Sequence, residues 1–407
     1  MKVLHLCYSD LSGGAARAAY RIHIAQRRLG IDSHMLVINK LSDNDYVHTV
    51  SKWCHIRIKI LNFVATSILK FKIKNNPVVH SINIFPSGVV KYINKLNPQI
   101  VNLHWIGCNM LSIHEVSKIQ QQIVWTLHDM WAFSGCEHYE DLNSPCQYVN
   151  GYKSEGFFTS DLNKIIFSLK VKKWKRKKIH LIAPSNWMGD CAKNSFLFKG
   201  NKISVISNCI DHKKYKPVYK QFARYVFGLP KEKKLILFGA MSSTSDVRKG
   251  YSLLKDALAI MKIKENVDDI ELVIFGASKG SYSDNVNMKE HYLGTLADDV
   301  SLSLLYSAVD IFVAPSLQDN LPNTLVESLA SGTPCVAFNI GGMSDLISSE
   351  IFGSLVDEVD SNSLADSIMT LLKMKANPNL ISEKSAKLRN ESSIAQQYYE
   401  IYKLYIN

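Results

Sequence analysis

Two groups of polar residues in the second half of the chain have the types and spacing to handle a phosphorylated sugar. The first is the run Asp-Val-Arg-Lys-Gly at 246–250, which places Arg248 and Lys249 as adjacent cations at the start of a helical pattern. Adjacent cations suit the two phosphates of a nucleoside diphosphate, because they neutralise charge that builds on a leaving group. A solvated loop is the alternative interpretation.

The second group follows an apolar run that ends at residue 314. Asp319 falls in the loop, Asn320 and Leu321 follow with backbone amides, and Glu327 comes eight positions after Asp319 in a helical pattern. Two carboxylates so placed can bind sugar hydroxyls at one end and ribose hydroxyls at the other. A helix-capping Asp319 and a surface Glu327 fit the bare spacing equally well.

Two histidines and a glycine pair could do chemistry in the first half. His128 follows the apolar run 123–127 directly, and His104 lies at the end of another. An imidazole there could hydrogen-bond a sugar hydroxyl or assist proton transfer, and neighbouring backbone could equally satisfy the ring. Gly13 and Gly14 open a helical pattern, where backbone N–H groups can meet a phosphate. The full GxGxxG spacing and its acidic partner are missing, which argues against a dehydrogenase.

Short apolar runs alternate with helical patterns along the chain and must position these residues. The runs are 3–7, 33–38, 100–105, 123–127, 180–183, 203–206, 235–238, 272–275, 311–314 and 334–338. This alternation predicts an α/β fold of two doubly wound parallel-sheet domains joined near 208–217. Parallel sheets bind ligands beyond the carboxyl ends of their strands, so the polar residues above are expected to line a cleft between the domains.

The charge indicates an anionic partner. Lys and Arg number 48 against 36 Asp and Glu, a formal net charge of +12, and seven of the nine residues 170–178 are basic. Residues 53–74 interleave basic and apolar side chains, which suits a helix lying in a membrane interface. An ordinary amphipathic helix with a solvated basic face fits 53–74 equally well. Zinc-finger and RNA-binding signatures are absent, so no nucleic acid is expected as a partner.

The cysteines and the first residues indicate the compartment. The eight cysteines are scattered and mostly lie in apolar runs, which is typical of a reducing environment. Cys136, Cys146 and His138 lack a fourth ligand and a close cysteine pair, so no metal is expected. The first residues read as a strand and not as a signal peptide, so a cytoplasmic location is expected.

The run SLQDNLPNTLVESLASGTPCVAFNIGGMSDLI at 316–347 resembles the donor-binding signature of the retaining family-four glycosyltransferases, which have the GT-B fold. Further segments match in order: the glycine pair at 13 and 14, WTLHDMW at 125–131, APSNWM at 183–188 with ISNCID at 206–211, and DVRKG at 246–250. The resemblance spans nearly the whole chain. Asp319 departs from it, where the family usually has Glu, and so does Ala240, where the family often has Arg.

The resemblance implies a role for each candidate residue. Glu327 would bind the ribose, Asp319 the donor sugar, and Lys249 the diphosphate, and His128 would lie near donor sugar and acceptor. It also implies an acceptor-binding domain at 1–208, a nucleotide-sugar domain at 209–390, and a final helix within 391–407 that crosses back to the first domain. The complete expected sets are His128, Asp319 and Lys249 for catalysis; Gly14, Arg248, Lys249, Asp319, Asn320, Leu321 and Glu327 for the donor; His104 and His128 for the acceptor.

We therefore expect a retaining hexosyltransferase that uses a nucleotide-diphosphate sugar as donor substrate and no cofactor. The expected acceptor is a lipid-linked glycan at an anionic membrane surface, on the inner face of the plasma membrane, in the synthesis of lipopolysaccharide O-antigen, capsule or exopolysaccharide. The alternative is a catalytically silent protein that binds nucleotide sugars or glycans on the same fold, which Asp319 in place of Glu favours. A nucleic-acid-binding protein would explain the charge but none of the cleft residues.

Overall fold

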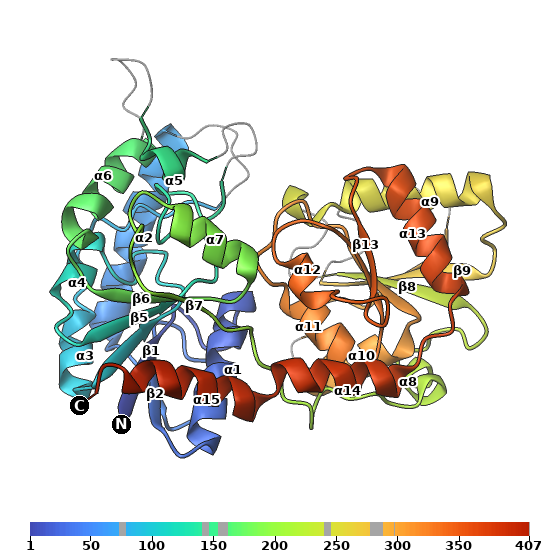
Figure 1. The fold of residues 1–407 in the computed structure, drawn as a ribbon, viewed down its shortest axis with the longest axis horizontal. Helices are drawn as coiled ribbons and strands as arrows, with labels where there is room; N and C mark the ends of the chain where they lie inside the picture. The colour runs from blue at the N-terminus through green and yellow to red at the C-terminus, as the bar shows by residue number, and fades with distance from the viewer. Residues whose placement is uncertain are drawn as a thin grey trace. The chain divides into compact units, whose positions relative to one another are not determined.

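The chain forms two compact units. The computed structural model describes residues 1–72, 79–140, 146–153, 162–239, 246–276, 288–296 and 298–406. The first unit is Met1–Ser207 together with Glu391–Asn407, and the second is Asn208–Asn390. Each unit is built on a parallel sheet flanked by helices (Figure 1).

The sheet of the first unit has the strand order β3-β2-β1-β4-β5-β6-β7, and every neighbouring pair is parallel. The central strands are almost wholly buried, because helices cover both faces of the sheet. The strands are β1 (Lys2–Leu6), β2 (Asp32–Val37), β3 (Val47–Thr49), β4 (Ile100–Leu103), β5 (Gln122–Thr126), β6 (Ile179–Ala183) and β7 (Ile203–Val205).

Alternate residues of β1 serve the two faces of this sheet. Leu4 and Leu6 join the larger core, while Cys7, which directly follows β1, packs with Ala16 and Ala19 of the first helix. The last helix of the chain, α15, packs against α1, and the two lie side by side in Figure 1. The helices of this unit are α1 (Gly14–Arg28), α2 (Lys52–Lys72), α3 (Val90–Leu96), α4 (Ile113–Lys118), α5 (Gln147–Asn150), α6 (Leu162–Trp174), α7 (Asn186–Asn194) and α15 (Glu391–Lys403).

The second unit repeats the plan with the strand order β10-β9-β8-β11-β12-β13. Its strands are β8 (Lys234–Gly239), β9 (Ile270–Phe275), β10 (Glu290–Tyr292), β11 (Ile311–Ala314), β12 (Cys335–Phe338) and β13 (Gly353–Val356). Its helices are α8 (Lys220–Val226), η1 (Val247–Lys249, a 3-10 turn), α9 (Tyr251–Lys264), α10 (Asp299–Ala308), α11 (Asn323–Ala330), α12 (Met343–Leu346), α13 (Ser361–Lys373) and α14 (Pro378–Arg389).

Separate apolar cores lie on the two faces of the second sheet. One contains Leu235 and Leu237 of β8 with side chains of α10 and α11, and the other contains Ile236 and Phe238 with side chains of α9 and α13. Two parallel sheets, each covered on both faces, confirm the predicted α/β class with two doubly wound domains. The prediction missed the edge strands β3, β10 and β13, which lack the continuous apolar run of a strand that is buried on both faces. Within the described residues, no helix has the length and apolarity needed to cross a membrane.

Candidate active site

The turn that precedes α9 positions Arg248 and Lys249. Asp246 caps this turn, because its carboxylate accepts a hydrogen bond from the Arg248 backbone N–H at 3.1 Å. The same carboxylate accepts hydrogen bonds from the Arg248 guanidinium at 2.7 and 3.1 Å, so the Arg248 side chain is directed to Asp246. Gly250 has a φ of +68°, and a Cβ there would lie 1.8 Å from the Pro315 carbonyl oxygen. Only glycine allows the turn to pack this closely against the loop after β11.

The loops after β11 and β12 hold the backbone of Asp319. The Leu317 N–H donates to the Arg248 carbonyl at 2.7 Å, which joins the loop after β11 to the turn before α9. Gly341, with a φ of +55°, approaches so closely that its Cβ would lie 2.0 Å from the Asp319 carbonyl oxygen. The Gly342 N–H donates to the same oxygen at 3.3 Å. Three segments far apart in sequence thus position Asp319 at the carboxyl edge of the second sheet.

Lys249 and Asp319 meet at this edge as an ion pair. The Lys249 Nζ lies 2.6 Å from the Asp319 Oδ2. Lys249 also lines a small pocket at the carboxyl ends of β8 and β11, together with Gly239, Ser316 and Thr324. A lysine ammonium at a pocket wall can bind an anionic oxygen, and the Asp319 carboxylate holds that ammonium in place.

Glu327 is a buried acid on α11, one helical turn after Thr324. Glu327 is only 3% exposed, so the alternative interpretation of Glu327 as a surface residue is wrong. Its Oε2 accepts a hydrogen bond from the Tyr306 hydroxyl at 3.2 Å. Burial and the Glu327 carboxylate raise the pKa of Tyr306 well above its usual value, so the phenol stays a neutral donor. Sequence reasoning missed Tyr306, because only the packing of α10 against α11 brings it to Glu327.

The remaining predicted donor residues have other surroundings. Asn320 and Leu321 are buried within the loop that carries Asp319. Gly14 belongs to the first unit, where it is the exposed first residue of α1. Gly13 before it has a φ of +94°, which allows the sharp entry into that helix. Ala240 lies outside the described residues.

In the first unit, the paired strands β4 and β5 bring the two predicted histidines together. The His104 Nδ1 lies 2.9 Å from the His128 Nε2, and the rings stack with centroids 5.1 Å apart. Both histidines line a small pocket with Trp105, Asp129 and His138. Burial lowers the pKa of His128 to about 4, although Asp129 opposes this shift, and burial also lowers the pKa of His104. Both imidazoles are therefore neutral at pH 7.

Sequence reasoning missed a second polar pair in this pocket. The Asp129 Oδ2 lies 2.5 Å from the His138 Nδ1, and the His138 Nε2 lies 2.8 Å from the Ser81 Oγ. Burial opposes ionisation of Asp129, but the neighbouring His138 and a hydrogen bond from the Trp131 N–H hold the pKa of Asp129 below its usual value. From the sequence, His138 is considered only as a possible metal ligand together with Cys136 and Cys146. Cys146 is exposed in the structure.

The basic segment 170–178 is less exposed than the sequence predicts. Lys170 is fully buried, and its Nζ donates to the carbonyls of Ser134 at 3.1 Å and Gly135 at 2.6 Å, above the Trp131 ring at 3.8 Å. Burial lowers the pKa of Lys170 to about 7. Lys170 therefore does not belong to the basic surface that is expected to meet an anionic partner, because its side-chain nitrogen binds carbonyl oxygens of the segment after β5. The exposed cations of this segment are Lys172, Lys175, Arg176 and Lys178.

Helix α2 exposes large apolar side chains. Its inner face contributes Cys54, Ile58 and Ala65 to the core. On its outer face Trp53 is 83% exposed and Phe63 is 74% exposed. The outer face also carries Ile56, Ile60, Val64, Phe71 and the cations Lys52, Arg57, Lys59 and Lys70. The outer face of α2 is therefore both apolar and basic, and not only a solvated basic face. Lys74, the last residue of the predicted stretch 53–74, lies outside the described residues.

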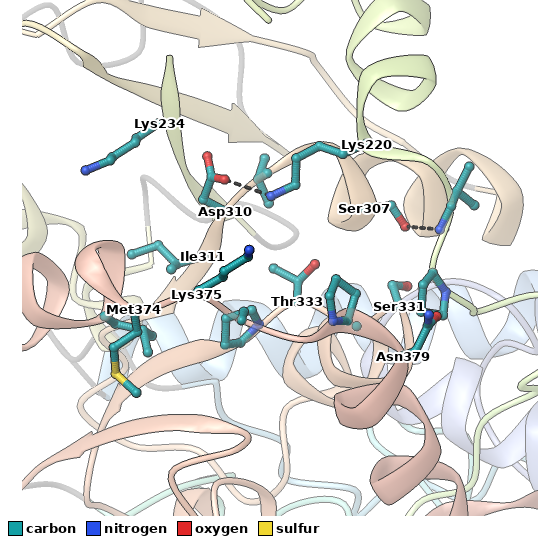
Figure 2. Close-up of a pocket in the computed structure, with 18 of the residues that line it drawn as sticks. Lys220, Lys234, Ser307, Asp310, Ile311, Ser331, Thr333, Met374, Lys375 and Asn379 are labelled. Atoms are coloured by element: carbon teal, nitrogen blue, oxygen red, sulfur yellow. Dashed lines mark hydrogen bonds and ion pairs between the residues drawn. The ribbon is translucent and has the colours of Figure 1, made fainter. Parts of the chain in front are cut away.

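A larger pocket of about 510 Å³ opens at the opposite edge of the second sheet, where β8, β11 and β12 begin. Figure 2 shows Lys220, Asp310, Thr333 and Lys375 around it, with the Lys220 Nζ 2.7 Å from Asp310. Ligands of open parallel sheets bind at the carboxyl edge, so the pocket near Lys249 is the better candidate for a substrate site despite its smaller volume.

Comparison with known proteins supports the family assignment. Residues 12–214 match a protein-family model described as Glycosyltransferase Family 4, and residues 232–374 match one described as Glycosyl transferases group 1. HepE of Anabaena, solved in complex with UDP-glucose, superimposes with a TM-score of 0.64 at 18% identity and covers 99% of both chains.

Two curated relatives match over part of their length. The phosphatidyl-myo-inositol mannosyltransferase of Mycobacterium leprae (strain TN) is 32% identical over 36% of this chain and 39% of its own length. The UDP-Gal:alpha-D-GlcNAc-diphosphoundecaprenol alpha-1,3-galactosyltransferase of Escherichia coli is 26% identical over 51% of this chain and 54% of its own length. Each match therefore spans less than two thirds of the relative. With two doubly wound domains of the GT-B type and family models matching both halves, the chain belongs to glycosyltransferase family 4.

Proposed function

We propose that the chain is a retaining hexosyltransferase that transfers a sugar from a nucleotide-diphosphate sugar to a glycan acceptor. The observation that carries this proposal is the Lys249–Asp319 ion pair at the pocket beyond β8 and β11. A cation that an acid holds at the carboxyl edge of a parallel sheet suits a phosphate group. The names of the E. coli galactosyltransferase and of the HepE complex support a nucleotide-sugar donor.

In this proposal the second unit binds the donor. Lys249 and Arg248 would bind the diphosphate, and the buried Glu327 would accept hydrogen bonds from the ribose hydroxyls. Asp319, with the neighbouring Asn320 and Leu321, would bind the sugar. From the first unit, Gly14 would contribute the N-terminus of α1, whose positive helix-dipole end attracts an anion.

The proposed reaction is a direct exchange at the anomeric carbon. The bond from this carbon to the diphosphate oxygen breaks, and its electron pair stays on the departing phosphate. The acceptor hydroxyl oxygen forms the new bond on the same face, and its proton passes to that phosphate. Negative charge on the phosphate grows along the reaction, so the Lys249 ammonium stabilises the transition state more than the bound donor. His128 would bind the sugar and the acceptor near this carbon, and no step uses a metal or a cofactor.

A binding and transfer assay tests this function. UDP, GDP and ADP, each alone and with common hexoses attached, are screened for a rise in melting temperature, since a ligand of the folded state stabilises it. One nucleotide should stabilise the chain selectively, and its radiolabelled sugar should move to a glycan acceptor at the same rate with and without EDTA. A chain that no nucleotide sugar stabilises would contradict the proposal.

We also propose that the acceptor is a lipid-linked glycan at the inner face of the plasma membrane, in the synthesis of a surface polysaccharide such as O-antigen or capsule. The outer face of α2 supports this, because exposed Trp53 and Phe63 lie on the same face as several cations. Aromatic side chains enter the interface of a bilayer while cations bind its anionic headgroups. The diphosphoundecaprenol acceptor in the name of the E. coli relative is consistent with such a substrate.

The second candidate is a catalytically silent protein that binds nucleotide sugars or glycans. Asp319 stands where the family usually has Glu, so its carboxylate is one methylene shorter. Selective stabilisation by a nucleotide sugar without transfer or hydrolysis of the radiolabelled sugar would favour this candidate over the enzyme.

A further inference from the structure

Three imidazoles form a continuous hydrogen-bonded line through the first unit. His5 lies on β1, His104 follows β4, and His128 follows β5, so the order of strands in the sheet sets the order of the rings. The His5 Nδ1 lies 2.8 Å from the His104 Nε2, and the His104 Nδ1 lies 2.9 Å from the His128 Nε2. His5 and His104 are buried, whereas His128 is partly exposed where it lines the pocket with Asp129.

The inner end of this line is a glutamine that α1 and α15 hold. The His5 Nε2 lies 2.9 Å from the Gln26 Oε1, and the Gln26 Nε2 donates to the Tyr402 hydroxyl at 3.1 Å. The Tyr402 oxygen accepts a second hydrogen bond from the Asn102 amide at 2.8 Å. Gln26 thus presents a carbonyl oxygen to His5, and a carbonyl oxygen can only accept a hydrogen bond.

This acceptor determines where every proton of the line must be. The His5 Nε2 carries a hydrogen, so the Nδ1 of a neutral His5 is bare and accepts from His104. The His104 Nε2 then carries a hydrogen, its Nδ1 is bare, and the His128 Nε2 must donate to it. The remaining Nδ1 of His128 is left as an acceptor. Burial lowers the pKa of His5 to about 4, with the Gln26 hydrogen bond opposing the shift, so the ring is neutral at pH 7.

We propose that Gln26, His5 and His104 are positioning residues that hold His128 in the tautomer with its proton on Nε2, so that its Nδ1 accepts a hydrogen bond from a substrate hydroxyl. That this hydroxyl belongs to a sugar rests on the proposed function. A neutral imidazole in the other tautomer would donate from Nδ1 and would suit a carbonyl or a phosphate instead. Both ring nitrogens of His104 are used within the line, so His104 supports His128 and does not itself bind the acceptor.

The tautomer can be read without any assay of activity. The full chain is labelled with ¹⁵N-histidine, and long-range proton–nitrogen spectra at pH 7.5 distinguish the protonated from the bare nitrogen of each neutral ring. The His128 signals are identified by their loss in His128→Gln. We expect a protonated Nε2 and a bare Nδ1 in His128. A proton on Nδ1 of His128, or a mixture of tautomers in the wild type, would overturn the proposal.

A variant pair tests whether Gln26 imposes this order. Gln26→Met removes the acceptor at similar volume, so the His128 signals should become those of a tautomer mixture, and kcat/KM should fall about tenfold, the effect of one hydrogen bond. Ser33→Ala is the matched control, because Ser33 bonds the buried His23 at 2.8 Å outside the line. An unchanged His128 tautomer in Gln26→Met would also overturn the proposal. If the wild type transfers no sugar, the proposed function fails while the tautomer result is still decided by the spectra.

Discussion

At the scale of the residue, Lys249 and Asp319 are the pair on which the proposed chemistry depends. The Lys249→Ala variant should lose roughly 10²-fold in kcat with a smaller change in donor affinity, because charge on the leaving phosphate is greater in the transition state than in the bound donor. Arg248→Ala should lose less, since the Arg248 guanidinium is directed to Asp246. Steady-state kinetics with the stabilising donor give both values. Lys384→Ala, an exposed lysine on α14, is the control, and equal rates in Lys249→Ala and this control would remove Lys249 from the mechanism.

Glu327 carries the second prediction at this scale. Glu327→Ala should abolish transfer, and Glu327→Gln, which keeps the shape of the side chain, should weaken donor binding at least tenfold. A charge-assisted hydrogen bond typically contributes about 1.5 to 3 kcal/mol, and the amide also loses part of the acceptor capacity that the ribose would use. Titration calorimetry measures the affinity, and circular dichroism checks that the fold is intact. Wild-type affinity in a folded Glu327→Gln would show that Glu327 does not bind the donor.

At the scale of the element, helix α2 combines a core face with an apolar outer face. Replacing Trp53 and Phe63 with Ser should reduce sedimentation with anionic vesicles about tenfold or more, because each apolar side chain that leaves water contributes about 1.5 to 3 kcal/mol. This loss should persist at high salt. Ile263→Ser is the matched control, since Ile263 is 85% exposed on α9 of the second unit. Sedimentation that is the same in both variants would leave α2 without a role at the membrane.

The basic segment 170–178, which begins within α6, is expected to depend on salt differently from α2. Gln in place of Lys172, Lys175 and Lys178 should weaken vesicle binding at low salt and have little effect at high salt, because exposed charges are screened there. Lys177 is not replaced in this variant. Its ammonium donates to the Ser117 carbonyl at 3.3 Å, so replacing Lys177 would disturb the fold as well as remove a charge.

At the scale of the whole molecule, buried neutral histidines predict that acid destabilises the first unit. Burial lowers the pKa of His5 to about 4 and that of His23 to about 2, from the usual 6.5. Between about pH 6.5 and pH 4 the unfolded chain therefore binds protons on these histidines, whereas the folded chain does not. Their contribution to the free energy of unfolding is fully present well above pH 6.5 and decreases as the pH falls toward 4. From pH 7 to pH 5.5 each such histidine should cost about 1 kcal/mol of unfolding free energy.

Urea unfolding followed by tryptophan fluorescence checks this, because all six tryptophans lie in the first unit. His23→Gln should show a smaller decrease between the two pH values by about 1 kcal/mol, since one titrating group is gone. An equal decrease in wild type and His23→Gln would mean that His23 titrates normally in the folded chain.

The sequence alone determined the fold class and most of the central strands. A strand buried on both faces needs a continuous apolar run, and this local requirement is visible in any one segment, such as 311–314. The same local logic proposes Lys249, Asp319 and His128 as candidate ligand-binding residues, because such residues of a parallel sheet lie in the loops that follow its strands. Edge strands such as β10, with three residues, left no such pattern.

Only the tertiary structure decided which of these residues meet and which are buried. Tyr306 reaches Glu327, and His5 reaches His104, through the packing of helices and the parallel pairing of strands that are far apart in sequence. In the sequence, Lys170 is one of seven cations in a basic segment, and only the structure shows that carbonyl oxygens of the segment after β5 bind its side chain. Periodicity shows which side of an element is apolar. Whether another element covers that side, or whether it stays exposed as on α2, depends on long-range packing that no single segment encodes.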